Sequence, residues 1–147
     1  MPLTYEECLR LGLLRKIPAS KEKASRSLEK AQSWLGEAKS TLKTKAFNSS
    51  VSASYLAMFH SARSILFFDG MREKSHACIA RYLEHYAKQG KLEQKWVDLL
   101  DHCREIRHEE QYDLGFFATR EDAENQMKSA IKFALRIEQL LSQLTKG

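Results

Sequence analysis

The sequence predicts an all-α protein, an antiparallel up-and-down bundle of four long helices preceded by a short N-terminal helix. The 147 residues include only 6 Gly and 2 Pro, too few for the many turns of a β-sandwich. Apolar residues recur at intervals of three and four, the period of one helix face. We expect one domain over 1–147, with a short helix and linker in 1–18 and the bundle in 20–145.

Capping signals place the first two helices. Thr4 followed by Glu7 is typical of a capping box and predicts a helix over about 5–15. After Pro18, Ser20 is expected to cap a second helix that ends near residue 43. The apolar residues of this second helix form one stripe, namely Ala24, Leu28, Ala31, Leu35, Ala38 and Leu42.

The next helix is expected to follow the polar break at 48–50 and to end at Gly70. Its apolar residues lie on two sides, which is usual for a helix at the centre of a bundle or in an oligomer interface. One side is formed by Val51, Tyr55, Met58, Phe59, Ala62, Ile65 and Leu66. The second side is the line Leu56, His60, Arg63 and Phe67.

Three further helices complete the predicted bundle. Ser75 is expected to cap one that ends near Gly90, and another follows with a stripe from Leu92 to Ile106. Thr119 with Asp122 predicts the start of the last helix. Its stripe is Ala123, Met127, Ala130, Ala134, Ile137, Leu141 and Leu144. No stretch of useful length alternates as a strand does.

The net charge of +5 is concentrated in the first third of the chain. Residues 1–50 carry 10 basic and 5 acidic side chains, whereas residues 101–147 carry 7 and 9. A basic region of this kind attracts polyanions such as RNA. It is also compatible with a solvated, lysine-rich helix face.

The three cysteines, Cys8, Cys78 and Cys103, have no paired spacing. We therefore expect free thiols and a reducing, cytoplasmic location. The longest apolar hydrocarbon run spans only residues 65–68, far short of the roughly 20 residues of a membrane helix. We expect no contact with a membrane.

The five histidines do not form a metal-binding pattern. Glu105 and His108 make one Glu-x-x-His pair inside a predicted helix, whereas a di-metal bundle needs that pair on two helices. Phosphate-binding glycine loops and nucleophile elbows are also missing from the sequence. We expect neither a metal nor another cofactor.

The densest polar cluster, 104–113, supplies the first candidates for a functional site. Arg107 follows Leu100 and Cys103 at helical spacing, which puts its side chain beside the buried stripe. Such an arginine needs either a carboxylate or an external anion such as a phosphate. His108 could act as a general base, and Tyr112, one turn later, could bond at the same helix end.

A second group of candidates lies on other helices. His60 and Arg63 share one helix face, and His76 stands at the predicted start of a helix. They could form the opposite wall of a groove that binds RNA or a nucleotide, together with Arg104 and Asp113 of the polar cluster. Local packing is the alternative role for each of them.

Several segments resemble proteins of the HEPN-domain family. The helix SYLAMFHSARSIL at 54–66 is similar to the central helix of that family. Gly70 followed by His76, and the segment KQGKL at 88–92, resemble elements of its small prokaryotic branch. The segment from Arg107 to Tyr112-Asp113 resembles the polar motif of that branch, and the resemblance covers about residues 20–145. His60, Arg63 and His76 occupy the matching helix positions.

The resemblance implies a helical bundle, commonly a homodimer, with the polar motif near a groove. Many members are RNA-cutting toxins, and many pair with a minimal nucleotidyltransferase in a toxin–antitoxin system. Their nuclease motif is an Arg followed, after four to six residues, by a His. Here three residues separate Arg104 from His108, and Arg107 reaches Tyr112 rather than a histidine.

Three functions follow as hypotheses. The first is a module that binds nucleic acid or a nucleotide and acts with a partner, in a toxin–antitoxin or RNA-related defence system. The second is a metal-independent ribonuclease that uses Arg107 with Tyr112 or His108. The third is a non-catalytic dimeric scaffold. Whether the chain is an enzyme stays open at this point.

Overall fold

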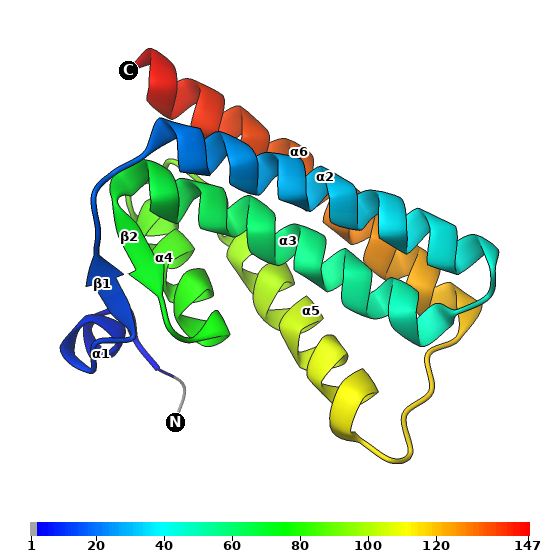
Figure 1. Ribbon diagram of the computed structural model, residues 1–147. Coiled ribbons are helices and arrows are strands. Elements are labelled where there is room, and N and C mark those ends of the chain that lie inside the picture. Colours follow the sequence, from blue (N-terminus) through cyan, green and yellow to red (C-terminus); the bar gives the residue numbers. More distant parts are fainter. Residues whose placement is uncertain (1–2) are drawn as a thin grey trace.

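The computed structural model describes residues 3–147. Four helices are long, α2 (Lys21–Lys43), α3 (Phe47–Asp69), α5 (Gln94–Tyr112) and α6 (Arg120–Lys146) (Figure 1). The shorter elements are α1 (Tyr5–Arg10), α4 (His76–Lys88) and two three-residue strands, β1 (Leu14–Lys16) and β2 (Met71–Glu73). The predicted all-α bundle is confirmed, because the sheet holds only these two strands within the described residues.

Helix α3 lies at the centre of the fold. It packs against α2, α4, α5 and α6, and the stripe predicted from 51 to 66 is buried throughout. Tyr55 is only 1% exposed although it is large and polar at one end. A helix with neighbours on most sides needs apolar residues around most of its circumference, which explains the fully buried stripe. The second line, Leu56, His60, Arg63 and Phe67, is only half-buried.

The pair α2–α3 is fixed by small residues and two hydrogen bonds. Ala24, Ala31 and Ala38 of α2 are buried, and their size lets the helix backbones approach closely. The Ser50 hydroxyl donates to the carbonyl oxygen of Ala38 at 2.9 Å. The Ser27 hydroxyl donates to the carbonyl oxygen of His60 at 2.7 Å. These bonds set the register of α3, and with it the position of the candidate residues on α3.

The N-terminal segment corrects two predictions. The first helix ends at Arg10 rather than near residue 15, and β1 follows, antiparallel to β2, with Leu14 opposite Glu73. Gly12 makes the turn between α1 and β1 with a φ of 70°. The prediction that the chain lacks strands was wrong for these six residues. A three-residue strand is too short to show a period of two in the sequence.

Gly70 is required at the end of α3. Its φ is 80°, a left-handed conformation that suits glycine. A Cβ atom at this position would stand 2.6 Å from the carbonyl oxygen of Ile17. The Gly70 carbonyl also accepts a hydrogen bond from the Ile17 amide at 2.9 Å. The close approach holds the end of α3 and β2 against the segment after β1.

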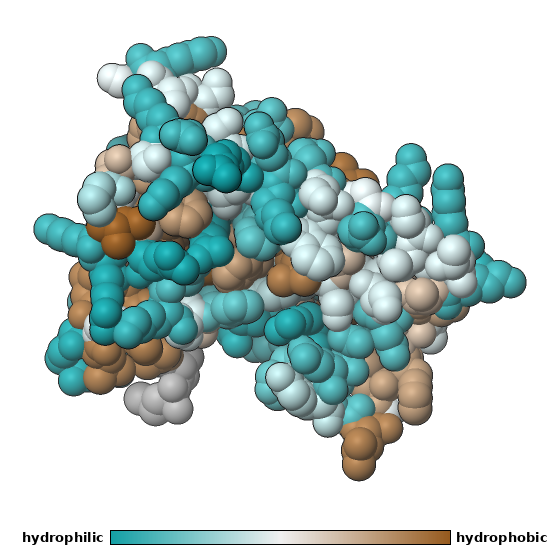
Figure 2. All heavy atoms as spheres, viewed as in Figure 1, coloured by the Kyte–Doolittle hydropathy of each residue, from teal (hydrophilic) through white to brown (hydrophobic). Residues whose placement is uncertain are grey.

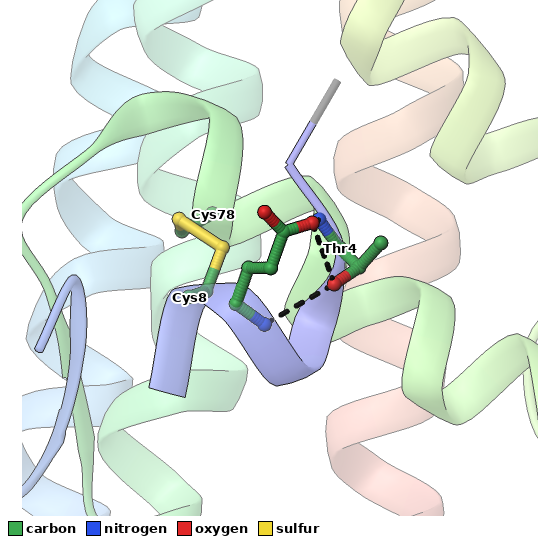
Figure 3. The surroundings of a disulfide bond; sticks show 4 residues. Thr4, Cys8 and Cys78 are labelled. Carbon is green, nitrogen blue, oxygen red and sulfur yellow. Dashed lines mark hydrogen bonds between the residues drawn. A yellow bond between two sulfur atoms is a disulfide. The ribbon is translucent and has the colours of Figure 1, made fainter. Parts of the chain in front are cut away.

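Cys8 of α1 and Cys78 of α4 form a disulfide, with their Cα atoms 5.9 Å apart (Figure 3). The prediction of three free thiols was therefore wrong for this pair, and only Cys103 is free among the three. The capping box of Thr4 and Glu7 starts α1 beside the bond, as predicted. Seventy residues separate the two cysteines in the chain, so their sequence spacing carried no signal of the pairing.

The helix starts follow the prediction with one exception. The capping box of Thr119 and Asp122 begins α6, as expected. Helix α3 begins at Phe47, ahead of the polar residues expected to cap it. Asn48 instead accepts a hydrogen bond from the Ala118 amide at 2.8 Å and ties down the α5–α6 loop. None of the described helices combines the length and the hydropathy needed to cross a membrane.

Candidate functional site

The candidate site lies along one side of α3. Ser52, Leu56, His60, Arg63 and Phe67 follow one another at helical spacing and are all half-buried. In Figure 1, α3 crosses the middle of the view, with α2 on one side and α4 and α5 on the other. The line is therefore partly exposed in the single chain.

Tyr55 of α3 and His76, the first residue of α4, interact across the site. The Tyr55 hydroxyl and His76 Nδ1 lie 3.2 Å apart, and the two rings stack with centroids separated by 5.9 Å. The Phe59 ring lies 4.3 Å from the His76 ring. A buried tyrosine and a buried phenylalanine thus orient an imidazole that is itself exposed.

His76 is held in its neutral form near pH 7. Partial burial lowers its pKa, and the positive charges of Arg107, Arg104 and Arg63 lower it further. Burial raises the pKa of the Tyr55 hydroxyl, so that group stays protonated. The pair is therefore a neutral phenol and a neutral imidazole surrounded by arginines.

His60 is neutral for the same reasons. Burial lowers its pKa to about 4, with additional effects of Arg63, Lys30 and His76. Its ring meets the Phe59 ring edge-on, at 5.0 Å between centroids. His60 and His76 thus contact the same phenylalanine and lie in the same region of positive potential.

Arg107 of α5 is the cation of the site that lacks a carboxylate partner. Its guanidinium carbon lies 5.8 Å from the centre of the Tyr55 ring, a cation–π arrangement. Its side chain makes neither a salt bridge nor a hydrogen bond to any residue in 3–147, and its Nε atom is buried. A half-buried guanidinium without an acidic partner favours binding of an external anion.

Two acidic residues on the same helix as Arg107 have other partners. Asp101 forms ion pairs with Arg81 and, at 3.6 Å, with Arg104. The Glu110 carboxylate accepts a hydrogen bond from the Ser52 hydroxyl at 2.7 Å, which ties α5 to α3. Arg104, a predicted binding residue, is therefore partly neutralised, whereas Arg107 keeps its full charge.

Comparisons with known proteins decide the family. The family model described as HEPN domain matches residues 24–140, most of the chain. The chain belongs to the HEPN domain family. It is also 25% identical over 125 residues to the protein named "Putative toxin MJ0605" of Methanocaldococcus jannaschii, covering 84% of this chain and 92% of that protein. The resemblance noted in the sequence is thereby confirmed.

In this HEPN chain, Arg63 is engaged by its surroundings. Its Nε atom lies 2.6 Å from the carboxylate of Glu73, which is 7% exposed. Its guanidinium also lies 5.4 Å from the Phe59 ring and 5.2 Å from the Phe67 ring. Arg63 therefore joins β2 to α3, and much of its charge is neutralised.

His108 and Tyr112 lie apart from Arg107, on the solvent side of α5. Both are exposed, Tyr112 by 63%, and their rings pack on each other at 4.8 Å. Asp113 is exposed beyond the end of α5, where its carboxylate accepts a hydrogen bond from the Gly115 amide at 2.9 Å. The structure thus groups Arg107 with His76 and Tyr55, and places the other three candidates at the outer end of α5.

Figure 2 shows an apolar patch at the tip of the α5–α6 loop, close to that outer end. Leu114 is 95% exposed there, and Phe117 is also exposed. The two residues continue the exposed surface that Tyr112 begins.

Sequence reasoning missed the roles of Tyr55 and Phe59 at the site. Both residues were assigned only to the buried stripe. They do belong to it, but each ring also contacts the His76 ring. Their spacing of four residues beside His60 was the available signal. Among residues 3–147, no group of three or more His, Cys, Asp or Glu side chains is placed to hold a metal ion.

Proposed function

We propose that this protein is a HEPN-type, toxin-like module that binds RNA, with Arg107 contacting a phosphate of the strand. The observation that carries the proposal is the half-buried guanidinium of Arg107, which has no carboxylate partner within the described residues. Phosphate oxygens accept the hydrogen bonds that such a group offers. The exposed ring of His76 stands on the same side and offers a surface on which a base can stack.

The test is RNA binding measured by fluorescence anisotropy with a labelled single-stranded RNA pool. Arg107→Ala is expected to weaken binding about 10- to 100-fold, the range for losing a hydrogen bond to a charged group. The slope of log affinity against log salt should fall by about 0.7, the contribution of one phosphate on a single strand. Arg107→Lys keeps the charge but not the planar fork, so its RNA affinity should lie between those of wild type and Arg107→Ala.

Arg10→Ala is the matched control, because Arg10 is an exposed arginine on α1 that forms no ion pair or hydrogen bond with a described residue of the site. It removes the same charge and should leave the affinity near that of the wild type. Equal losses in Arg10→Ala and Arg107→Ala would show that only net charge matters, and would contradict a binding role for Arg107. Wild-type protein that binds no RNA at low salt would contradict the proposed function itself.

A second candidate, a metal-independent ribonuclease at the same site, is favoured by the Tyr55–His76 hydrogen bond. In the tautomer in which His76 Nδ1 donates to the Tyr55 oxygen, Nε2 is free to accept a proton. It would take the proton of a ribose 2′-hydroxyl as that oxygen bonds to phosphorus and the bond to the 5′-oxygen breaks. The leaving oxygen would take a proton from water, and Arg107 would stabilise the negative charge of the transition state.

Cleavage of a pooled RNA in the presence of a chelator tests this candidate. His76→Gln and Arg107→Ala should each abolish cutting and the appearance of cyclic phosphate ends. Cutting that survives His76→Gln but is lost in His108→Gln or Tyr112→Phe would show that the general base lies at the exposed end of α5. Cutting that survives in all four variants would contradict catalysis at either position.

We further propose that the protein works with partners, as a homodimer and beside a nucleotidyltransferase. The name of the archaeal relative supports a toxin role, and a toxin needs a partner that restrains it. The exposed apolar tip of the α5–α6 loop supports a protein contact near Tyr112. Sedimentation at micromolar concentration tests the dimer, and growth arrest on expression, relieved by a co-expressed nucleotidyltransferase, tests the pairing.

A further inference from the structure

A second basic cavity is lined by His60 and by residues of α3 that follow it, whereas Arg107 lies against Tyr55, earlier in α3. It measures about 300 Å³ and is lined by residues of α2, α3 and β2. We call it the α2–β2 pocket, and four of its lining residues are cations, namely Lys23, Arg26, Arg63 and Arg72. None of its lining residues is acidic.

Ion pairing leaves most of this positive charge in place. Arg63 is neutralised by Glu73, but Lys23 and Arg72 form no ion pair with any residue of 3–147. Arg26 lies 3.7 Å from Glu22, and both side chains are more than 70% exposed, so this contact is weak. The pocket therefore offers two unpaired cations and a third that is easily released.

One cation of the pocket, Arg72, also faces a cation outside it, Arg15, whose Nε donates to the Gly12 carbonyl oxygen at 3.2 Å. Arg72 stands directly opposite Arg15 in the β1–β2 ladder, and both side chains are exposed. Like charges opposite each other destabilise an antiparallel pair. A bound anion would remove this repulsion, which is the second observation that points to an anionic ligand.

His60 connects the pocket to the Arg107 site. It lines the α2–β2 pocket, and its ring contacts Phe59, which in turn contacts His76. The two basic regions are thus consecutive along α3 rather than on opposite faces. Single-stranded RNA is bound by such grooves, in which cations follow the backbone between aromatic rings.

We propose that the α2–β2 pocket binds a second phosphate group of the same RNA strand, several nucleotides along the strand from the phosphate on Arg107. This inference rests on the proposed function, since it concerns the same ligand, but it assigns different residues. Lys23 and Arg72 would contact the phosphate, and Phe67 would lie beside the adjoining sugar or base. The unpaired cations belong to exposed side chains, so their replacement should not disturb the fold.

The experiment compares a short and a long labelled oligouridylate on wild type, on Lys23→Ala/Arg72→Ala and on Lys128→Ala/Lys132→Ala. The last variant is the matched control, because both of its lysines are exposed on α6 and line neither site. We expect the pocket variant to bind the long strand at least tenfold more weakly and the short strand unchanged. The salt slope for the long strand should fall by about 0.7, the contribution of the one phosphate that the pocket holds.

Two further arms separate this inference from the proposed function. NMR of the His60 ring with inorganic phosphate as the probe should show a shift in wild type and in Arg107→Ala, but none in the pocket variant. Adenosine monophosphate should compete weakly against the long strand. A pocket variant that binds long RNA as the control does would overturn the second subsite while leaving Arg107 as the RNA contact.

The remaining outcomes are also decisive. Tight binding of the mononucleotide, lost in the pocket variant while long RNA binds normally, would assign the pocket to a free nucleotide and overturn the RNA assignment. No response of His60 to phosphate, together with no RNA binding by wild type, would overturn both proposals. A His60 response without RNA binding would keep a phosphate site and reject the RNA strand as its ligand.

Discussion

Arg63 and Arg107 are both half-buried arginines beside aromatic residues of α3, yet their surroundings differ. Arg63 pairs with the buried carboxylate of Glu73 and lies near two phenylalanine rings. Arg107 lies near Tyr55 and forms no ion pair within the described residues. Asp101 and Glu110 of the same helix bind other partners. The same side chain is therefore a structural tie in one region and an open anion site in the other. The two arginines differ because only Arg63 has a carboxylate to pair with.

The largest expected effect is a difference in the free energy of unfolding between variants of these two arginines. Arg63→Ala leaves the Glu73 charge buried without its partner and should lower the free energy of unfolding by about 3–5 kcal/mol. Arg107→Ala removes only a cation–π contact and should cost less than about 1 kcal/mol. Urea unfolding followed by circular dichroism measures both changes.

Glu73→Gln in the Arg63→Ala background is the control for that comparison. It removes the stranded charge and should restore part of the lost stability. Similar losses for Arg63→Ala and Arg107→Ala would mean that Arg107 is also a structural residue, and the comparison between the two regions would fail.

The second prediction concerns the covalent tie near the Arg63 region. The disulfide joins α1 to α4 near the β1–β2 sheet, whereas nothing comparable holds α5 within the described residues. Cys8→Ser should lower the free energy of unfolding by about 2–4 kcal/mol. RNA affinity at Arg107 should change little, because α5 does not take part in the bond. Dithiothreitol should reproduce the loss in wild type and have no further effect on the variant.

The third prediction uses His60, which lies between the two regions. Its pKa is about 4 in the folded chain and 6.5 as a free side chain. Between these values the unfolded chain binds more protons, so stability is full above pH 6.5 and falls as the pH decreases toward 4. Because His60 is only half-buried, solvent screening reduces the free energy that its pKa shift represents, and His60 should account for about 1 kcal/mol of that loss.

Unfolding measured at a series of pH values in wild type and His60→Gln checks this sign. The variant should show a shallower decline below pH 6.5. The lowered pKa of His76 acts in the same direction, so His60→Gln should reduce the decline without removing it. A variant that loses stability as steeply as wild type would show that His60 is protonated freely in the folded chain.

The smallest expected effect is a gain of stability at the edge of the α2–β2 pocket. Arg72→Ala removes the repulsion with Arg15 across the ladder and should stabilise the fold by about 0.2–1 kcal/mol. Lys74→Ala, an exposed change just beyond β2, should have no such effect. A loss of stability in Arg72→Ala would mean that Arg72 makes a stabilising contact, and would weaken the case that these cations are retained for a ligand.

Much of the fold could be predicted from the sequence because its causes are local. The stripes of α2 and α6 follow the helical period, and the capping box of Thr119 and Asp122 marks the start of α6. The segments that failed, β1 with β2 and the Cys8–Cys78 disulfide, depend on pairs about 55 to 70 residues apart. The end of the first helix had a local signal that was missed, because Gly12 adopts the left-handed conformation typical of the residue just after a helix. The strand pairing that follows it had no such signal.

The sequence by itself determined the helical bundle, the family resemblance and the choice of Arg107, His60, Arg63 and His76 as candidates. Periodicity and residue type are enough for these, because they reflect which side of one helix is buried. Only the tertiary structure decided their roles. Whether an arginine is neutralised depends on carboxylates brought from other elements, and here Arg63 meets Glu73 while Arg107 meets the Tyr55–His76 pair and keeps its charge.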